Sequence, residues 1–298
     1  FNNGVSATMA IYDKAADNFI VKPLVISSET VQKPVLYENM VWVPLPRSLN
    51  FWTYNYNNPT NLSDDTDYIL GEPNGFKEGT LSVAFDKAGD AWIGTYGGIR
   101  VLQNAASEIK SSQPKAEPII IEQNGLGEEL FRDSAILQIA VDAGDHKWVS
   151  VEGGGVYYLS SDGQKTIKHF TRENSPLPTN NVTDIKIDKK TGKVYFVTYN
   201  GIVTYQGDVA DVTANFGDVL VYPNPVVYSN FKGKVTIKGL AEKTNIRIVD
   251  AAGNVVHSAV ARGGYYEWDL NNQKGTRVAS GMYFVLMTNE DGSDKATA

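Results

Sequence analysis

The sequence feature that most limits the fold of this chain is a segment that recurs along it. Three copies begin with a run in which apolar residues alternate with small or polar ones and which ends in aspartate, at residues 81–86, 137–142 and 183–188. After a short turn, a second run starts with an aromatic residue, and a glycine-bearing turn leads to a third. Alternation with period two is typical of a half-buried β-strand, and Gly-Gly or Asn-Gly supplies the positive φ of a tight hairpin.

The spacing of these copies predicts the architecture. With a weaker copy upstream, the aromatic positions are Trp42, Trp92, Trp148 and Tyr195, about 50 residues apart. Four short strands and their turns need about 40–50 residues, which is one blade of a β-propeller. We therefore predict an all-β chain in which residues 1–208 form propeller blades, with a leading strand at 7–12 and fourth strands at 118–122 and 167–170. Propellers close with typically 4–8 blades, so these four form either a small ring or part of a larger one. Because the sequence opens at Phe1 rather than at methionine, we expect the second, an incomplete ring. The aromatic residue of each repeat is predicted to pack between blades.

The C-terminal part has a different pattern. Residues 209–217 are polar and lack periodicity, which predicts a linker. Residues 218–298 contain alternating strands at 234–238, 245–249 and 282–287, separated by turn signals. Short strands at this spacing predict an immunoglobulin-like β-sandwich.

Charge and composition exclude several function classes. The chain has 27 Lys+Arg and 34 Asp+Glu residues; 9 and 8 of these lie in the last 81 residues, which leaves 18 and 26, a net charge of −8, in residues 1–217. An acidic body without a basic tract argues against a nucleic-acid partner. The absence of cysteine excludes disulfides and thiol catalysis. No apolar run reaches the ~20 residues of a membrane helix, so no transmembrane segment is predicted.

We predict no catalytic residue, no cofactor and no metal site, and hence a protein that is not an enzyme. The three histidines, His146, His169 and His257, fall in different repeats and lack the spacing of a metal pair. Asp86 and Asp142 each open a turn, and we expect their carboxylates to cap these turns by accepting hydrogen bonds from backbone N–H groups.

One aromatic run is a candidate binding surface. One face of the strand at residues 51–56 would carry Trp52, Tyr54 and Tyr56, which suits stacking on sugars or on a partner. Packing of the same rings inside the blade is the favoured alternative.

The blade repeat resembles a known family. Residues 74–101 contain Asp86-x-x-Gly89-x-x-Trp92-Ile-Gly-Thr95, and the copies at 124–158 and 174–205 are similar. This pattern resembles the two-component-regulator propeller repeat. The resemblance implies the fold, whereas such propellers occur in glycan sensors, secreted cargo and secretion machinery alike.

The C-terminal segment resembles the C-terminal sorting domain of the type IX secretion system of Bacteroidetes. The residues that carry this resemblance are Tyr222, Pro223, Asn224, Pro225, Asp250, Gly253, Trp268 and Gly281. It implies export through the periplasm to the cell surface, in association with the outer membrane. The family ends in a final strand with a Lys-led terminal motif, whereas this sequence ends at Asp294-Lys-Ala-Thr-Ala298, so we expect the last strand to be incomplete here.

Propeller blades followed by such a domain also resemble the surface propeller subunit of that system's attachment complex. This implies a non-catalytic scaffold whose partners are the sortase and other secretion subunits, and which recognises lipopolysaccharide. Two alternatives stay open: a secreted cargo with an enzymatic part upstream, and the glycan-sensing ectodomain of a hybrid histidine kinase.

Overall fold

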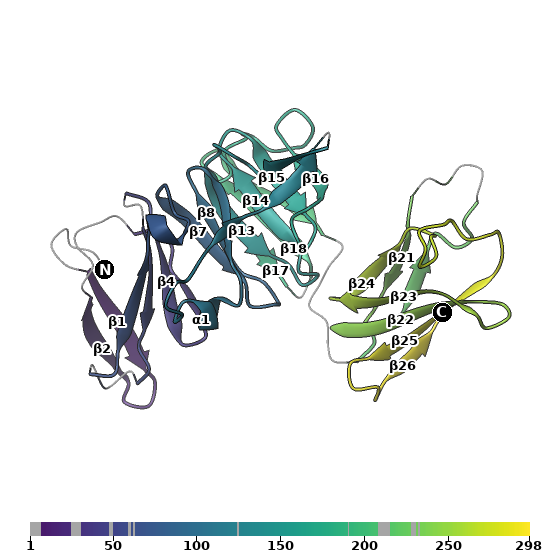
Figure 1. Cartoon of the computed structure of the whole chain (residues 1–298), viewed down its shortest axis with the longest axis horizontal. Coiled ribbons are helices and arrows are strands. Elements are labelled where there is room, and N and C mark those ends of the chain that lie inside the picture. Colours follow the sequence, from purple (N-terminus) through teal and green to yellow (C-terminus); the bar gives the residue numbers. More distant parts are fainter. Residues whose placement is uncertain are drawn as a thin grey trace. The chain divides into compact units, whose positions relative to one another are not determined.

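The computed structural model describes residues 7–24, 31–47, 50–58, 61, 63–123, 125–189, 191–207, 215–227, 231 and 233–298. This part of the chain consists almost entirely of strands and turns (Figure 1). The chain divides into two compact units, which are described separately. The first comprises residues 1–141, 147–186 and 196–203; the second comprises residues 142–146, 187–195 and 204–298. The predicted linker at 209–217 stays a prediction, because residues 208–214 lie outside the described ranges.

Four antiparallel sheets follow one another along the propeller region, and in each the strands pair in chain order. Blade 1 consists of β3 (Val35–Tyr37), β4 (Met40–Leu45), β5 (Asn50–Asn55) and β6 (Thr66–Leu70). Blade 2 consists of β7 (Thr80–Phe85), β8 (Ala91–Thr95), β9 (Gly98–Leu102) and β10 (Glu117–Pro118). Blade 3 consists of β13 (Ile136–Val141), β14 (Lys147–Val151), β15 (Gly155–Leu159) and β16 (Thr166–Phe170). Blade 4 consists of β17 (Asp184–Asp188), β18 (Lys193–Thr198) and β19 (Gly201–Gln206).

The remaining elements of the propeller region are two hairpins and two short helices. The hairpins are β1 (Ala7–Asp13) with β2 (Asn18–Leu24) and β11 (Ile120–Gln123) with β12 (Leu126–Glu129). The helices are the 3₁₀ turn η1 (Glu72–Asn74) and α1 (Ala105–Glu108). Within the described ranges no helix has the length and apolar character needed to cross a membrane.

The strand predictions are confirmed with one exception. The first strands of blades 2, 3 and 4 begin at Thr80, Ile136 and Asp184, and each pairs with the aromatic-led strand that follows it. The fourth strand predicted at 167–170 is β16. The one predicted at 118–122 is wrong beyond Pro118: β10 pairs with β9 over two residues, and the following residues form the β11–β12 hairpin. Pro118 has no N–H to donate, which is consistent with so short a ladder.

Successive blades are held together by the recurring tryptophans, as predicted. Trp42, Trp92 and Trp148 are buried. Trp42 clusters with Val83 and Ile93 of the next blade, and Trp148 lies 5.8 Å from Phe196, centroid to centroid. Tyr195 is only half-buried. Burying an aromatic ring against the neighbouring sheet removes apolar surface from water and adds ring–ring contact. Both effects stabilise the stacked sheets.

The aspartates at the turns act as caps, as expected. The Asp86 carboxylate accepts backbone N–H groups from Ala88 and Asp90 at 3.0 and 2.9 Å. The Asp142 carboxylate accepts those of Gly144 and His146, both at 2.9 Å.

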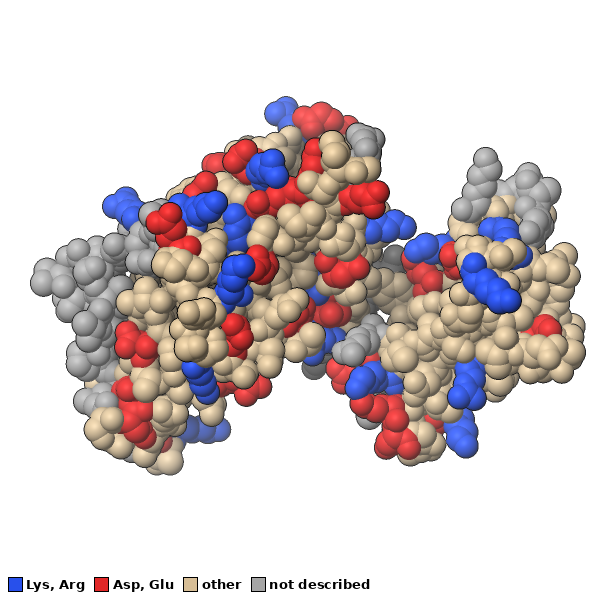
Figure 2. Space-filling view, viewed as in Figure 1, with Lys and Arg blue, Asp and Glu red and all other residues tan. Residues whose placement is uncertain are grey.

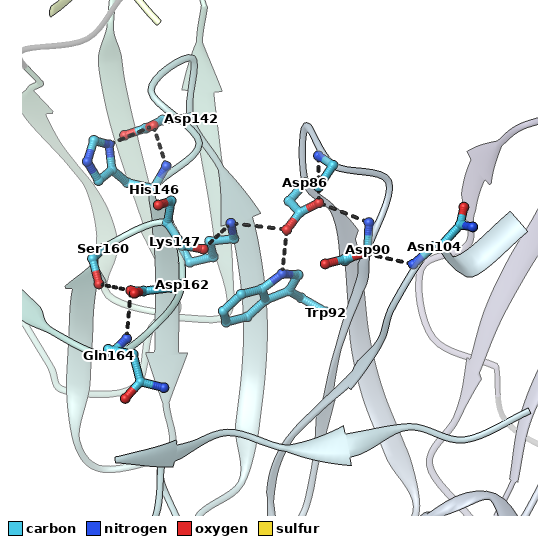
Figure 3. Close-up of polar contacts among 12 residues, drawn as sticks. Asp86, Asp90, Trp92, Asn104, Asp142, His146, Lys147, Ser160, Asp162 and Gln164 are labelled. Carbon is cyan, nitrogen blue, oxygen red and sulfur yellow. Dashed lines mark hydrogen bonds and ion pairs between the residues drawn. The ribbon is translucent and has the colours of Figure 1, made fainter. Parts of the chain in front are cut away.

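A buried cation connects blades 2 and 3 (Figure 3). The Lys147 Nζ lies 3.3 Å from the Asp86 carboxylate and 4.6 Å from the centroid of the Trp92 ring, and the Lys147 side chain is fully buried. It also donates to the Ser161 carbonyl at 2.5 Å. Trp92 Nε1 donates to the same carboxylate at 2.9 Å. The first turn of one blade is thus joined to the second strand of the next.

The C-terminal part is the predicted sandwich. One sheet has the order β20 (Leu220–Tyr222), β21 (Val235–Lys238), β24 (Tyr265–Trp268). The other has the order β23 (Val255–Arg262), β22 (Lys243–Asp250), β25 (Tyr283–Asn289), β26 (Lys295–Thr297). Between the sheets lies an apolar core that includes Ile237, Ile246, Ile248, Trp268 and Met287.

We predict that Lys147→Ala lowers the free energy of unfolding by about 3–5 kcal/mol, because it leaves the Asp86 carboxylate buried without its cation. Urea denaturation would measure this. Lys165→Ala, the same change at an exposed lysine of blade 3, is the control and should change stability by no more than about 0.5 kcal/mol. Equal effects of the two substitutions would contradict the structural role of Lys147.

Candidate functional site

The histidines occupy separate environments. His169 Nε2 lies 2.7 Å from the Gly154 carbonyl, and the ring stacks on Tyr157. His257 Nε2 lies 2.7 Å from the Tyr266 hydroxyl. Across the described ranges, no three His, Cys, Asp or Glu side chains come together in a way that could hold a metal ion.

Two rings of the aromatic run in blade 1 are packed inside the blade and do not form an open stacking face. Trp52 and Tyr54 are 2% and 8% exposed, and they pack with Val43 and Leu45. Their polar atoms are also engaged: Trp52 Nε1 donates to Asp67 at 3.2 Å, and the Tyr54 hydroxyl donates to the Asp65 carboxylate. Burial and the Asp65 hydrogen bond raise the pKa of Tyr54. Because β5 lies inside its sheet, these rings complete a packing layer, and only Tyr56, which is half-buried, stays a candidate for stacking.

One concave site lies in the sandwich. A groove of about 610 Å³ opens between the two sheets, lined from one side by Val221, Val235 and Trp268 and from the other by residues of β25. Among the predicted signature residues, five line it: Pro223, Asn224, Pro225, Trp268 and Gly281. Two sequence segments more than 50 residues apart thus meet at one site, and most of its lining is apolar.

The other half of this groove is formed by residues outside the predicted signature set. Leu270, Val278, Met282 and Tyr283 line it as well. Trp268 meets the Tyr283 ring edge-on, with centroids 5.6 Å apart, and the Tyr283 hydroxyl donates to the Ala279 carbonyl at 2.7 Å. These contacts hold the 278–283 loop against the core. The available signal was the apolar character of Val278 and Met282 just before a strand.

Three signature residues lie outside the groove lining. Tyr222 is partly exposed, with the Lys238 ammonium 5.6 Å from its ring centroid. The peptide bonds before Pro223 and Pro225 are cis. Asp250 and Gly253 form the turn between β22 and β23, where Gly253 has a φ of +85° that only glycine adopts readily.

Asp250 caps this turn. Its carboxylate accepts the backbone N–H groups of Ala252 and Asn254, both at 2.9 Å, and the Asn254 side-chain amide at 3.0 Å. Hydrogen bonds from the Asn254 side chain, and then from its backbone, hold the pKa of Asp250 below its ordinary value. Asp250 is therefore a turn-forming residue in this structure.

A second feature of the sandwich is the outward face of β25. Val285 and Met287 face the core, whereas Phe284 and Leu286 point away from it and are 41% and 40% exposed. In the ladder with β22, Leu286 lies opposite Arg247. A strand that is apolar on both faces is typical of one covered on both sides, so this face has the composition of an interface.

Comparison with known proteins identifies the class. Residues 220–297 match the family "Secretion system C-terminal sorting domain". Together with the blades, this match defines a β-propeller protein with a type IX sorting domain, and it indicates export to the cell surface or the outer membrane. No curated protein sequence matches the chain.

The particular protein that the chain resembles is PorZ of Porphyromonas gingivalis, a surface component of its type IX secretion system. The two share 26% sequence identity with a TM-score of 0.66, over 99% of this chain and 42% of PorZ. The chain thus spans less than half the length of PorZ. The extracellular domain of the hybrid two-component system BT3049 from B. thetaiotaomicron is 13% identical, with a TM-score of 0.44, over 98% of this chain and 49% of that one.

We predict that Asn254→Ala raises the pKa of Asp250 toward its ordinary value, because the largest stabilisation of the carboxylate is removed. A lowered folded-state pKa stabilises the fold above the unfolded-state pKa, and this contribution is lost as the pH falls through the folded-state value. The pH titration of the Asp250 carboxyl carbon by NMR would measure the shift. Asn272→Ala, which removes the cap of a different turn, should leave the Asp250 titration unchanged. An Asp250 pKa that is the same with and without Asn254 would contradict the assignment.

Proposed function

We propose that this chain belongs to a non-catalytic surface scaffold of the type IX attachment machinery, which binds secretion subunits such as the sortase, and lipopolysaccharide. The observation that carries the proposal is the likeness to PorZ over 99% of this chain, in which propeller blades are followed by the sorting domain. A sorting domain alone would suit any exported protein.

The outward face of β25 supports a partner on the sandwich. Phe284 and Leu286 are exposed, and Leu286 lies opposite Arg247, so a partner could bury the Phe284 ring and the Leu286 side chain and meet the guanidinium with a carboxylate. The groove at Pro223 and Met282 lies next to this face, because Phe284 also lines it.

The carboxylates at two turns of the propeller region have structural roles. The carboxylates of Asp86 and Asp142 are engaged in turn capping, and Asp86 also pairs with the buried Lys147. Groups held in this way serve packing and turn geometry.

A secreted cargo with an enzymatic part upstream is the second candidate. The sorting domain favours it, since that domain marks exported proteins in general. The third interpretation, a glycan-sensing kinase ectodomain, has the propeller repeat as its sole support.

Deleting the gene in its host bacterium would separate scaffold from cargo. A scaffold is needed by other proteins, so we expect other sorting-domain proteins to be released rather than attached to the surface. Loss of this protein alone, with all others attached normally, would favour the cargo interpretation. Complementation with Phe284→Glu should fail to restore attachment, whereas Thr288→Glu, at a polar position of the same strand, should restore it.

We further predict that the chain binds purified anionic lipopolysaccharide weakly and with little dependence on salt. Residues 1–217 carry a net charge of −8, and on the face drawn in Figure 2 basic and acidic side chains are interspersed. Long-range attraction therefore contributes little. In calorimetric titrations at two salt concentrations the affinity should fall less than about tenfold, against ~10³-fold or more for a site built on many phosphate contacts.

Two outcomes would contradict this prediction. Tight binding that is lost between low and physiological salt would reveal a focused basic patch. Absence of binding would shift the weight toward the cargo interpretation.

A further inference from the structure

One position of the blade repeat, in or just before the first strand of each blade, carries a polar residue in all four blades. In the ladders between first and second strands, Trp42 lies opposite Val35, Trp92 opposite Ala84, and Trp148 opposite Ala140. The residue two positions before each of these partners is Lys33, Ser82 and Gln138, respectively. In blade 4 the same place in the repeat is held by Asp184, the second residue of the copy at 183–188.

These positions point from one blade toward the next. The first strands of blades 2 and 3, β7 and β13, lie against each other. The Ser82 hydroxyl donates to the Ile136 carbonyl at 3.3 Å, and Gln138 Nε2 donates to the Asp184 carboxylate at 2.7 Å. Lys33, which precedes blade 1, reaches the Asp184 carboxylate of blade 4 with its Nζ at 3.5 Å. Residues from opposite ends of the propeller region thus meet at one carboxylate.

A second cation joins this cluster. Lys186 lies two residues after Asp184, so the two side chains share a face of β17, and the Lys186 Nζ is 3.7 Å from the other carboxylate oxygen. Both lysine–carboxylate distances exceed the length of an ordinary hydrogen bond. One carboxylate therefore faces two ammonium groups, and these three side chains carry a net charge of +1.

The cluster is open to solvent. The side chains of Lys33 and Lys186 are 51% and 56% exposed, and that of Asp184 is 31% exposed. Partial burial and the nearby Lys186 lower the pKa of Lys33, although Asp184 acts in the opposite direction. The Lys186 ammonium thus disfavours the charged form of Lys33, and a second anion between the two lysines would relieve that repulsion.

We propose that Lys33, Gln138, Asp184 and Lys186 form a binding site for a small hydroxylated oxyanion, such as a sugar acid or a sugar phosphate. The ammonium groups of Lys33 and Lys186 bind the carboxylate or phosphate group. Asp184 and the Gln138 side-chain carbonyl accept hydroxyl groups of the same ligand. The Gln138 side-chain amide, which lies between blades 3 and 4, orients the Asp184 carboxylate. This site is independent of the function proposed above, because a secreted cargo protein with these blades would carry it equally.

Titration of the full chain with glucuronate, glucose 6-phosphate and neutral glucose, followed by NMR of the lysine side chains, tests the site. Exposed ion pairs contribute little each, so we expect dissociation constants on the order of millimolar for the two anions. Glucose should bind at least about tenfold more weakly. Tighter binding of glucuronate would assign a carboxylate ligand and tighter binding of glucose 6-phosphate a phosphate ligand, and both results support the site.

Substitutions separate binding from folding. Lys33→Gln and Lys186→Gln should each weaken glucuronate binding about two- to fivefold, and the double variant should bind it no better than glucose. Lys189→Gln, at an exposed lysine just after β17, is the matched control and should bind as the unsubstituted chain does. Because these lysines are largely exposed, the melting temperatures should stay unchanged.

Asp184→Asn gives the sharpest result. It removes the anion that competes for the lysines, so inorganic phosphate, which needs no hydroxyl acceptor, should bind several-fold more tightly. A purely structural role of Asp184 would not produce this gain. The proposal is overturned if glucuronate binds no better than glucose, if the double lysine variant binds glucuronate normally, or if Asp184→Asn leaves phosphate binding unchanged.

Discussion

Burial of a sheet face against the neighbouring sheet is the interaction on which the propeller region depends. A four-stranded sheet has two faces, and a blade of about 50 residues cannot cover both alone. In this chain the face is covered by the next blade, and the repeat tryptophan of each of blades 1 to 3 is buried. The stability of each blade is therefore shared with its neighbours, and the position of every loop follows from that stacking.

Polar residues set the register between blades. Apolar contact alone tolerates small shifts, whereas the contact of Lys147 with Asp86 and the Trp92 ring requires one arrangement of blades 2 and 3. A buried charge must meet its partner, because its desolvation is otherwise uncompensated. The same logic, at lower burial, brings Gln138 to Asp184. The polar pairs that align the blades also bring several polar side chains close together, and such a cluster has the groups that a binding site needs.

In the sandwich, too, two sheets bury their faces against each other, but they do not close completely. Trp268 and Tyr283 join the two sheets at the core, yet the sheets leave a groove between Pro223 and Met282. On its outward face, β25 exposes Phe284 and Leu286. The signature residues therefore divide into those that shape the groove, such as Pro225 and Gly281, and those that form a turn, such as Asp250.

The sequence by itself determined the features that rest on local interactions. Strand positions follow from period-two alternation, and the caps at Asp86 and Asp142 follow from short-range hydrogen bonds between residues two to four apart. The buried tryptophans follow from the repeat. Only the tertiary structure decided what depends on stacking of distant segments. It buried Trp52 and Tyr54, because the exposure of a strand face is set by what covers it. It joined Pro223 to Met282 in one groove, and it brought Lys33 to Asp184 across 151 residues. Local hydrogen bonds depend on residues only a few positions apart, whereas contacts between distant segments depend on how complete sheets stack on one another.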